Sequence, residues 1–223
     1  MARITVVRHL EPLPLIVGGN DIDRELSAQG IADAESLLAN VKAAVDSDDV
    51  HPYLRKYGEG MSSPYARCLS TAKLIKDAVD TSWRWFEIPE LRESAHREQK
   101  VTLRNKTLTH EESTFDLHDR VARFLKMIHQ TVTPRLIVTH GDVVNAFRWC
   151  IEGMTLRQYR DLFNDPDNFV PFGCAWTFDT DKRIAERRVL GSTTPDKVVD
   201  FNNNFHGGSD GYRTTYTDFA REL

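Results

Sequence analysis

The sequence predicts an α/β fold, a three-layer sandwich in which helices cover both faces of a mostly parallel sheet. Apolar runs typical of buried strands, at residues 2–7 and 136–139, alternate with longer segments whose apolar residues recur at helical spacing. This alternation is typical of parallel strands joined by helices. No internal repeat or low-complexity linker divides the chain, so we expect a single domain over residues 1–223.

The first half of the chain predicts two helices and a short strand. An apolar stripe favours a helix over residues 24–45, with Ser27 as its N-cap. Residues 46–60 are expected to form a loop, or a loop with a weak strand. A second helix is predicted to start at Ser63, because the proline that follows it suits the first helical position. A short strand is expected just before Pro89.

The second half predicts an insertion, three helices and a hairpin. Residues 94–116 are charged and poor in apolar side chains, which indicates an irregular insertion that caps a pocket and whose basic residues would suit a substrate with additional negative charge. The remaining expected elements are helices over 115–132, 142–154 and 156–163, a closing hairpin over 173–179 and 184–190, and a loop from about residue 200.

The composition limits the possible partners. Lysine and arginine total 29 against 33 aspartate and glutamate, a net charge of −4, which favours neither nucleic acid nor a membrane surface as a partner. No run reaches the roughly 18 apolar residues of a membrane span, and the N-terminus lacks a signal-peptide pattern. Three cysteines without CxxC spacing predict reduced thiols and a cytoplasmic protein. No pattern indicates an oligomeric state.

Charged and imidazole side chains follow the two clearest strands. Arg8 and His9 come directly after the first, and His140 follows the strand over 136–139. Ligands of open α/β sheets bind beyond the carboxyl ends of the strands, so these side chains are expected to meet there. Arg67, in the first turn of a predicted helix, and Glu93, just after another strand, are expected to join them.

These residue types indicate phosphoryl-transfer chemistry. The guanidinium groups of Arg8 and Arg67, together with His140, would hold the oxygens of a phosphoryl group. A neutral histidine can itself attack phosphorus, and a carboxylic acid such as that of Glu93 can protonate the leaving alcohol. A small phosphorylated substrate is the expected partner, with no cofactor and no metal.

Four segments in order resemble the histidine phosphatase superfamily, whose fold is phosphoglycerate mutase-like. They are VVRHLE, SSPYARCLSTA, ELRE and IVTHGDVV, between about residues 3 and 150. The resemblance implies His9 as the nucleophile of a phosphohistidine intermediate and Glu93 as the proton donor. It also implies Arg8, Arg67 and His140 as phosphate ligands, and it implies that no metal is needed.

Departures from the family pattern keep alternatives open. Leu10 stands where the family has glycine, which would suit a weakly catalytic phosphate-binding or interaction module. The polar pair typical of the mutases is missing after the first motif, so a phosphatase is favoured over a phosphoglycerate-type mutase. Glu90 competes with Glu93 as proton donor, because ELRE offers both. A metal-dependent hydrolase built on His9 and His140 is a further alternative.

Overall fold

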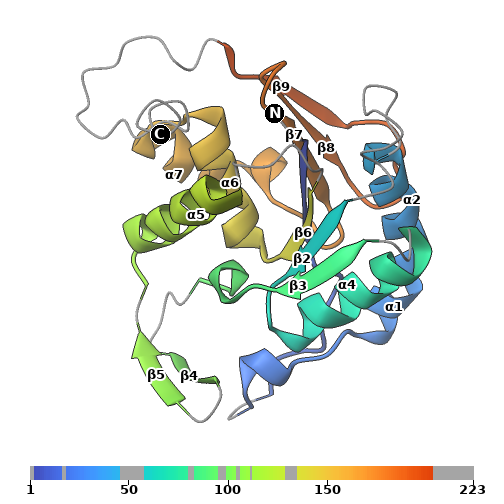
Figure 1. The fold of residues 1–223 in the computed structure, drawn as a ribbon, viewed down its shortest axis with the longest axis vertical. Coiled ribbons are helices and arrows are strands. Elements are labelled where there is room, and N and C mark those ends of the chain that lie inside the picture. Colours follow the sequence, from blue (N-terminus) through green and yellow to red (C-terminus); the bar gives the residue numbers. More distant parts are fainter. Residues whose placement is uncertain are drawn as a thin grey trace.

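The structure is a computed structural model that describes residues 3–16, 19–45, 58–79, 83–94, 99–103, 106–110, 112–128 and 135–202. Its centre is a seven-stranded sheet in the order β3-β2-β6-β1-β7-β8-β9 (Figure 1). The strands are β1 (Ile4–Arg8), β2 (Glu59–Ser62), β3 (Arg84–Glu87), β6 (Arg135–Thr139), β7 (Ala175–Asp179), β8 (Ile184–Arg188) and β9 (Lys197–Asp200).

Only half of this sheet is parallel. Strands β3, β2, β6 and β1 pair in parallel, whereas β7, β8 and β9 add to β1 in antiparallel order. The expectation of a mostly parallel sheet is therefore only partly correct. The closing hairpin does form, as β7 and β8, and it extends the same sheet. The short turn between β7 and β8 makes these two strands antiparallel to each other.

Helices cover both faces of the sheet, as expected for a three-layer sandwich. Helices α1 (Ala28–Ala32), α2 (Ala34–Val45) and α4 (Ala66–Val79) lie on one face, and α5 (Thr114–Ile128), α6 (Gly141–Glu152) and α7 (Leu156–Asn164) lie on the other (Figure 1). A separate apolar core fills each interface. Successive residues of β1 alternate between the two, with Val6 in the α5–α6 core and Val7 in the α2–α4 core.

Two helix boundaries differ from the predictions. The helix expected over 24–45 is divided at Asp33 into α1 and α2, although Ser27 does cap α1 by accepting a hydrogen bond from the Gly30 amide. The helix expected from Ser63 begins only at Ala66. No helix within the described ranges is both long and apolar enough to span a membrane.

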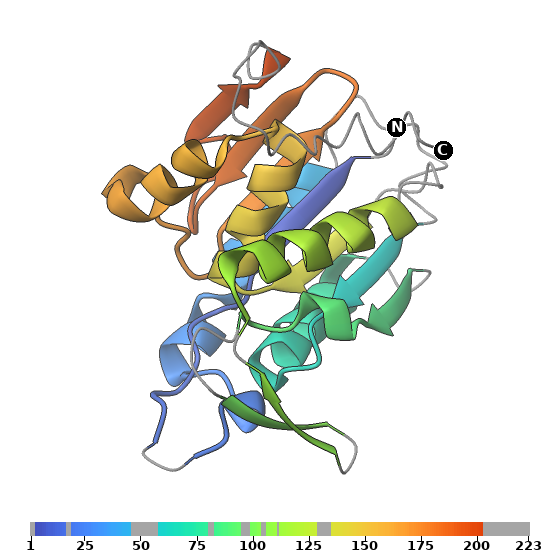
Figure 2. The same ribbon diagram turned by 90° about the vertical axis from the view of Figure 1, so that its left-hand side faces the viewer.

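The expectation of an irregular insertion over 94–116 is wrong in part. Strands β4 (Gln99–Leu103) and β5 (Lys106–His110) pair as a separate antiparallel hairpin. Val101 and Leu103 alternate with Lys100 and Thr102, and β-branched threonines flank Leu108, a pattern that suits strands despite the high charge. The hairpin projects from the end of the sheet at which β1 and β6 finish (Figures 1 and 2).

Candidate active site

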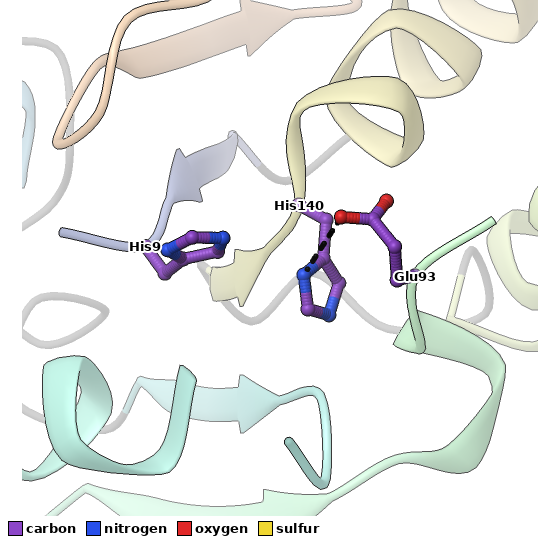
Figure 3. A group of neighbouring side chains, drawn as sticks. All are labelled: His9, Glu93 and His140. Atoms are coloured by element: carbon purple, nitrogen blue, oxygen red, sulfur yellow. Dashed lines mark ion pairs between the residues drawn. The ribbon is translucent and has the colours of Figure 1, made fainter. Parts of the chain in front are cut away.

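The pairing of β1 with β6 brings His9 and His140 together. Arg8 lies opposite Thr139 in the register, and the His9 amide donates a hydrogen bond of 2.9 Å to the Thr139 carbonyl. The two imidazoles, far apart in sequence, lie with their ring centroids 5.2 Å apart. Figure 3 shows them at the ends of adjacent strands, with Glu93 beside His140.

The ring of His9 is held in one orientation by its own backbone. Its Nδ1 lies 2.6 Å from the Leu10 carbonyl oxygen. A carbonyl can only accept, so Nδ1 carries the proton and Nε2 keeps a free electron pair. Burial, with the neighbouring His140 and Arg67, moves the pKa of His9 well below its ordinary value of 6.5. His9 is therefore a neutral imidazole whose basic nitrogen faces the interior of the site.

Arg67 connects most of the other groups. Its side chain is fully buried on α4, and Nε donates a hydrogen bond of 3.1 Å to His9 Nε2. Nη1 donates to the Asp21 carbonyl at 2.7 Å, and Nη2 lies 2.9 Å from the Asp21 carboxylate. Asp21 belongs to the short helix η1 (Asp21–Asp23) and was not predicted from the sequence. Its position in a polar loop carries no signal that distinguishes it from the neighbouring Asp23.

Glu93 completes the cluster, whereas Glu90 does not. Glu93 follows the short helix η2 (Pro89–Leu91), and its Oε2 lies 3.2 Å from His140 Nδ1 and 3.7 Å from Arg67 Nη2. Glu90 is exposed, within η2. Burial by itself would raise the pKa of Glu93, but His140, Arg67 and His9 outweigh it and lower that pKa to about 2. Glu93 is thus ionised in the ligand-free protein.

His140 is fixed on both sides. Its Nε2 lies 2.9 Å from the Ser63 hydroxyl, which makes Ser63 a partner of the site as well as a residue before α4. The Cys68 Sγ lies 3.5 Å from the same nitrogen. Burial raises the pKa of Cys68, so this residue presents a neutral thiol that packs against the ring. Burial also lowers the pKa of His140.

Arg8 lies beside this cluster and makes different contacts. Its guanidinium is 4.0 Å from the centroid of the Phe172 ring, and Nη1 donates to the Val170 carbonyl. Its Nε is buried and has no hydrogen-bond partner among the described residues. Gly141 makes this position possible, because a Cβ there would lie 3.3 Å from the guanidinium carbon. Arg8 therefore keeps a donor that a bound anion could satisfy.

Leu10 causes no strain at the position where the family has glycine. Among the described non-glycine residues, only Arg183 has a positive φ, so the backbone at Leu10 is ordinary. The Leu10 side chain is fully buried in the α2–α4 core, beside Val7 and Leu37. Its amide donates to the Thr71 hydroxyl at 3.1 Å. The leucine fills the core behind His9.

His9, Glu93 and His140 also form a possible metal-ligand set. Each offers one ligand atom, and these atoms lie within 4.8 Å of one another. The Arg67 guanidinium, however, contacts all three side chains. A divalent cation at this point would be repelled by that fixed positive charge, and His9 Nε2 already accepts a hydrogen bond from it. The electrostatics therefore favour an anion.

The chain is similar to known proteins in its fold and in its sequence pattern. No curated protein matches the chain. Among solved structures, the α-ribazole phosphatase of Shigella flexneri is 22% identical, with a TM-score of 0.58 over 86% of this chain and 98% of that one. A mycobacterial glucosyl-3-phosphoglycerate phosphatase in complex with inorganic phosphate is 14% identical, with a TM-score of 0.57 over 86% and 98%. At these identities the likeness shows the fold alone. The model of the histidine phosphatase superfamily (branch 1) matches residues 4–170, and the chain therefore belongs to that superfamily.

Proposed function

We propose that this protein is a metal-independent phosphatase that hydrolyses a phosphomonoester through a phosphohistidine at His9. The orientation of the His9 ring is the observation that carries the proposal. Its Nδ1–H is held by the Leu10 carbonyl, so the electron pair of Nε2 points toward Arg67 and His140. A neutral nitrogen nucleophile among buried hydrogen-bond donors suits attack on a phosphoryl group.

In the first step, the electron pair of His9 Nε2 forms a bond to phosphorus. The P–O bond of the ester breaks, and the departing oxygen takes a proton from the Glu93 carboxyl group, which releases the alcohol. Arg8, Arg67 and His140 donate hydrogen bonds to the phosphoryl oxygens as charge builds on them. Arg67 must first give up its bond to His9 Nε2, because that bond occupies the electron pair that attacks phosphorus.

Binding of the substrate would raise the pKa of Glu93, which is otherwise too low for this group to carry a proton. A pKa of about 2 leaves the carboxylate ionised. A phosphoryl dianion between Glu93 and Arg67 raises this pKa by like-charge repulsion and takes over the favourable contacts of the arginine, so Glu93 takes up a proton from solvent as the substrate binds. In the second step, water attacks phosphorus and gives a proton to Glu93. The N–P bond breaks, its electrons return to Nε2, and inorganic phosphate leaves.

A phosphatase screen over phosphorylated metabolites tests the proposal, with and without EDTA. His9→Ala should abolish phosphate release, whereas His118→Gln, a histidine on α5 outside the site, should retain it. Quenched reactions with labelled substrate should show protein-bound phosphate that is labile to acid and stable to alkali, as a phosphoramidate is.

Other outcomes would overturn the proposal in distinct ways. Full activity of His9→Ala would exclude the mechanism, and loss of activity with EDTA would favour the metal-dependent alternative. Transfer of the labelled phosphate to another position of the substrate, without release, would identify a mutase. Phosphate binding by an inactive wild-type protein would identify a binding module.

A further inference from the structure

A pocket of about 460 Å³ opens beside the cluster of His9, Glu93 and His140. Arg8 and Glu93 line one end of it, next to the place proposed for the phosphoryl group. Its other lining residues come from α6, from the C-terminal end of α7, and from the short helix η3 (Pro166–Asn168) and its flanking residues. An alcohol esterified to a phosphoryl group at His9 would extend into this space.

Asn145, in the pocket wall, has a buried side-chain atom without a hydrogen-bond partner among the described residues. The residue lies within α6 and is only 5% exposed. The atom is its Oδ1. A buried amide oxygen without a donor is costly, and asparagine is a poor residue for the middle of a helix. A ligand with an N–H or O–H group would satisfy it.

The rest of the wall is aromatic and acidic. Phe163 and Phe169, which are 52% and 60% exposed, line the pocket and offer apolar surface to a ligand. Carboxylates of Asp142 and Asp165 also line the pocket. Among its described lining residues, Arg8 is the only cation.

We infer that this pocket binds the alcohol portion of the substrate and selects one with an apolar or aromatic ring and a hydrogen-bond donor, neutral or cationic. An alcohol that carries a second anionic group is disfavoured, because the carboxylates of the wall repel it. The inference rests on the proposed phosphatase function. It opposes the expectation drawn from the basic residues of segment 94–116, whose side chains lie outside those that the structure describes.

Three phosphomonoesters test whether the protein prefers a cationic or an anionic alcohol portion. They are tyramine phosphate, the same aryl phosphate with a propanoate arm in place of the aminoethyl arm, and ethyl phosphate as a ring-free reference. We expect kcat/KM for tyramine phosphate to exceed that for the propanoate by at least about tenfold. Equal values, or a preference for the propanoate, would overturn the inference.

Substitutions in the pocket test whether its residues cause the preference for tyramine phosphate. Asn145→Leu, a change of similar shape, should lower kcat/KM for tyramine phosphate by about tenfold and leave ethyl phosphate unchanged. Asp165→Asn should reduce the discrimination between the two arms. An equal loss on tyramine and ethyl phosphates would show that Asn145 acts through the fold, against the inference.

Product binding keeps this test separate from the test of the phosphatase function. Affinities of tyramine and of its propanoate counterpart can be measured by calorimetry on the wild-type protein. A protein that prefers tyramine but hydrolyses none of the three esters would refute the proposed function and keep the pocket assignment. A protein that hydrolyses all three esters at equal rates and binds both products equally would support the proposed function and refute the pocket assignment.

Discussion

Arg67 is the residue whose partners must change when an anion arrives. In the ligand-free protein its donors are taken by His9 and by the backbone and carboxylate of Asp21. The Asp21 carboxylate therefore holds a guanidinium edge that a phosphoryl group would need. A substrate must displace this contact, so part of its binding energy is spent on exchanging one anion for another.

Removing the charge of Asp21 should therefore tighten phosphate binding. We expect Asp21→Asn to lower the Kd of inorganic phosphate by about two- to fivefold, the range of a partly solvated ion pair. Asp23→Asn is the matched control, because Asp23 bonds to Asn20 and not to Arg67. Calorimetric titration measures both variants. An unchanged or higher Kd for Asp21→Asn would show that the carboxylate does not compete with the anion.

Glu93 and Glu90 can be separated by the leaving group of the substrate. Glu93→Gln should lower kcat/KM for an alkyl phosphate by about 10²- to 10⁴-fold, because kcat/KM reports the first step, in which an alkoxide cannot leave unprotonated. The loss should be much smaller for para-nitrophenyl phosphate, whose leaving group is a weak base. Glu90→Gln should leave both substrates unaffected, since Glu90 is exposed in η2. A uniform loss for both substrates would deny Glu93 the role of acid.

At the scale of elements, α5 positions the segment that carries Glu93. Arg120 of α5 donates to the carbonyls of Glu90 and Arg92. The same guanidinium forms two hydrogen bonds, of 2.7 and 2.6 Å, to the buried carboxylate of Glu112. The ion pair with Glu112 holds the Arg120 guanidinium, and the bonds of Arg120 to the two carbonyls tie α5 to the turn from which Glu93 extends.

Breaking that pair should affect both stability and catalysis. Arg120→Met leaves Glu112 charged and buried, and we expect the free energy of unfolding to fall by about 3–5 kcal/mol. The folded fraction should also show a lower kcat, because the turn before Glu93 loses its anchor. Arg123→Met, at an exposed position of the same helix, is the control. Urea unfolding measures the loss of stability, and kinetics at low temperature measure kcat of the folded protein. If Arg120→Met kept the wild-type free energy of unfolding and the wild-type kcat, the anchoring role would be contradicted.

The elements with the clearest hydrophobic pattern were the ones that could be predicted from the sequence. The strands that carry Arg8 and His140 are short apolar runs and were located from sequence, and with them the edge at which the site residues meet. The β4–β5 hairpin was missed because high charge concealed its alternation. The contact of Arg67 with Asp21 was missed because it depends on how a polar loop folds back over α4, which no local periodicity describes.

At the scale of the whole molecule, the buried histidines make stability depend on pH. The pKa values of His9 and His140 are lowered by burial in the folded state, whereas the unfolded chain has the ordinary value of 6.5. Below pH 6.5 the unfolded state therefore binds more protons, so the free energy of unfolding rises with pH in this window and is constant above it.

Denaturant titrations between about pH 5 and pH 8 measure this dependence. We expect a loss of up to about 1.4 kcal/mol per pH unit for each of the two histidines as the pH falls. His9→Ala removes one titrating group and should give a shallower slope. Glu93, with its lowered pKa, adds a separate loss only below its ordinary value of 4.5. A slope unchanged by His9→Ala would contradict the neutral state assigned to His9.

The central position of β1 in the sheet also determines how much of the chain must be synthesised before the site around His9 can form. β1 leaves the ribosome before β6 and β7, which are its neighbours in the sheet. A nascent chain that ends before residue 135 carries His9 after a strand with two apolar faces and without these neighbours, a state that chaperones recognise. His9 is thus made well before the strands that surround it. Enzyme activity would therefore report completion of the fold.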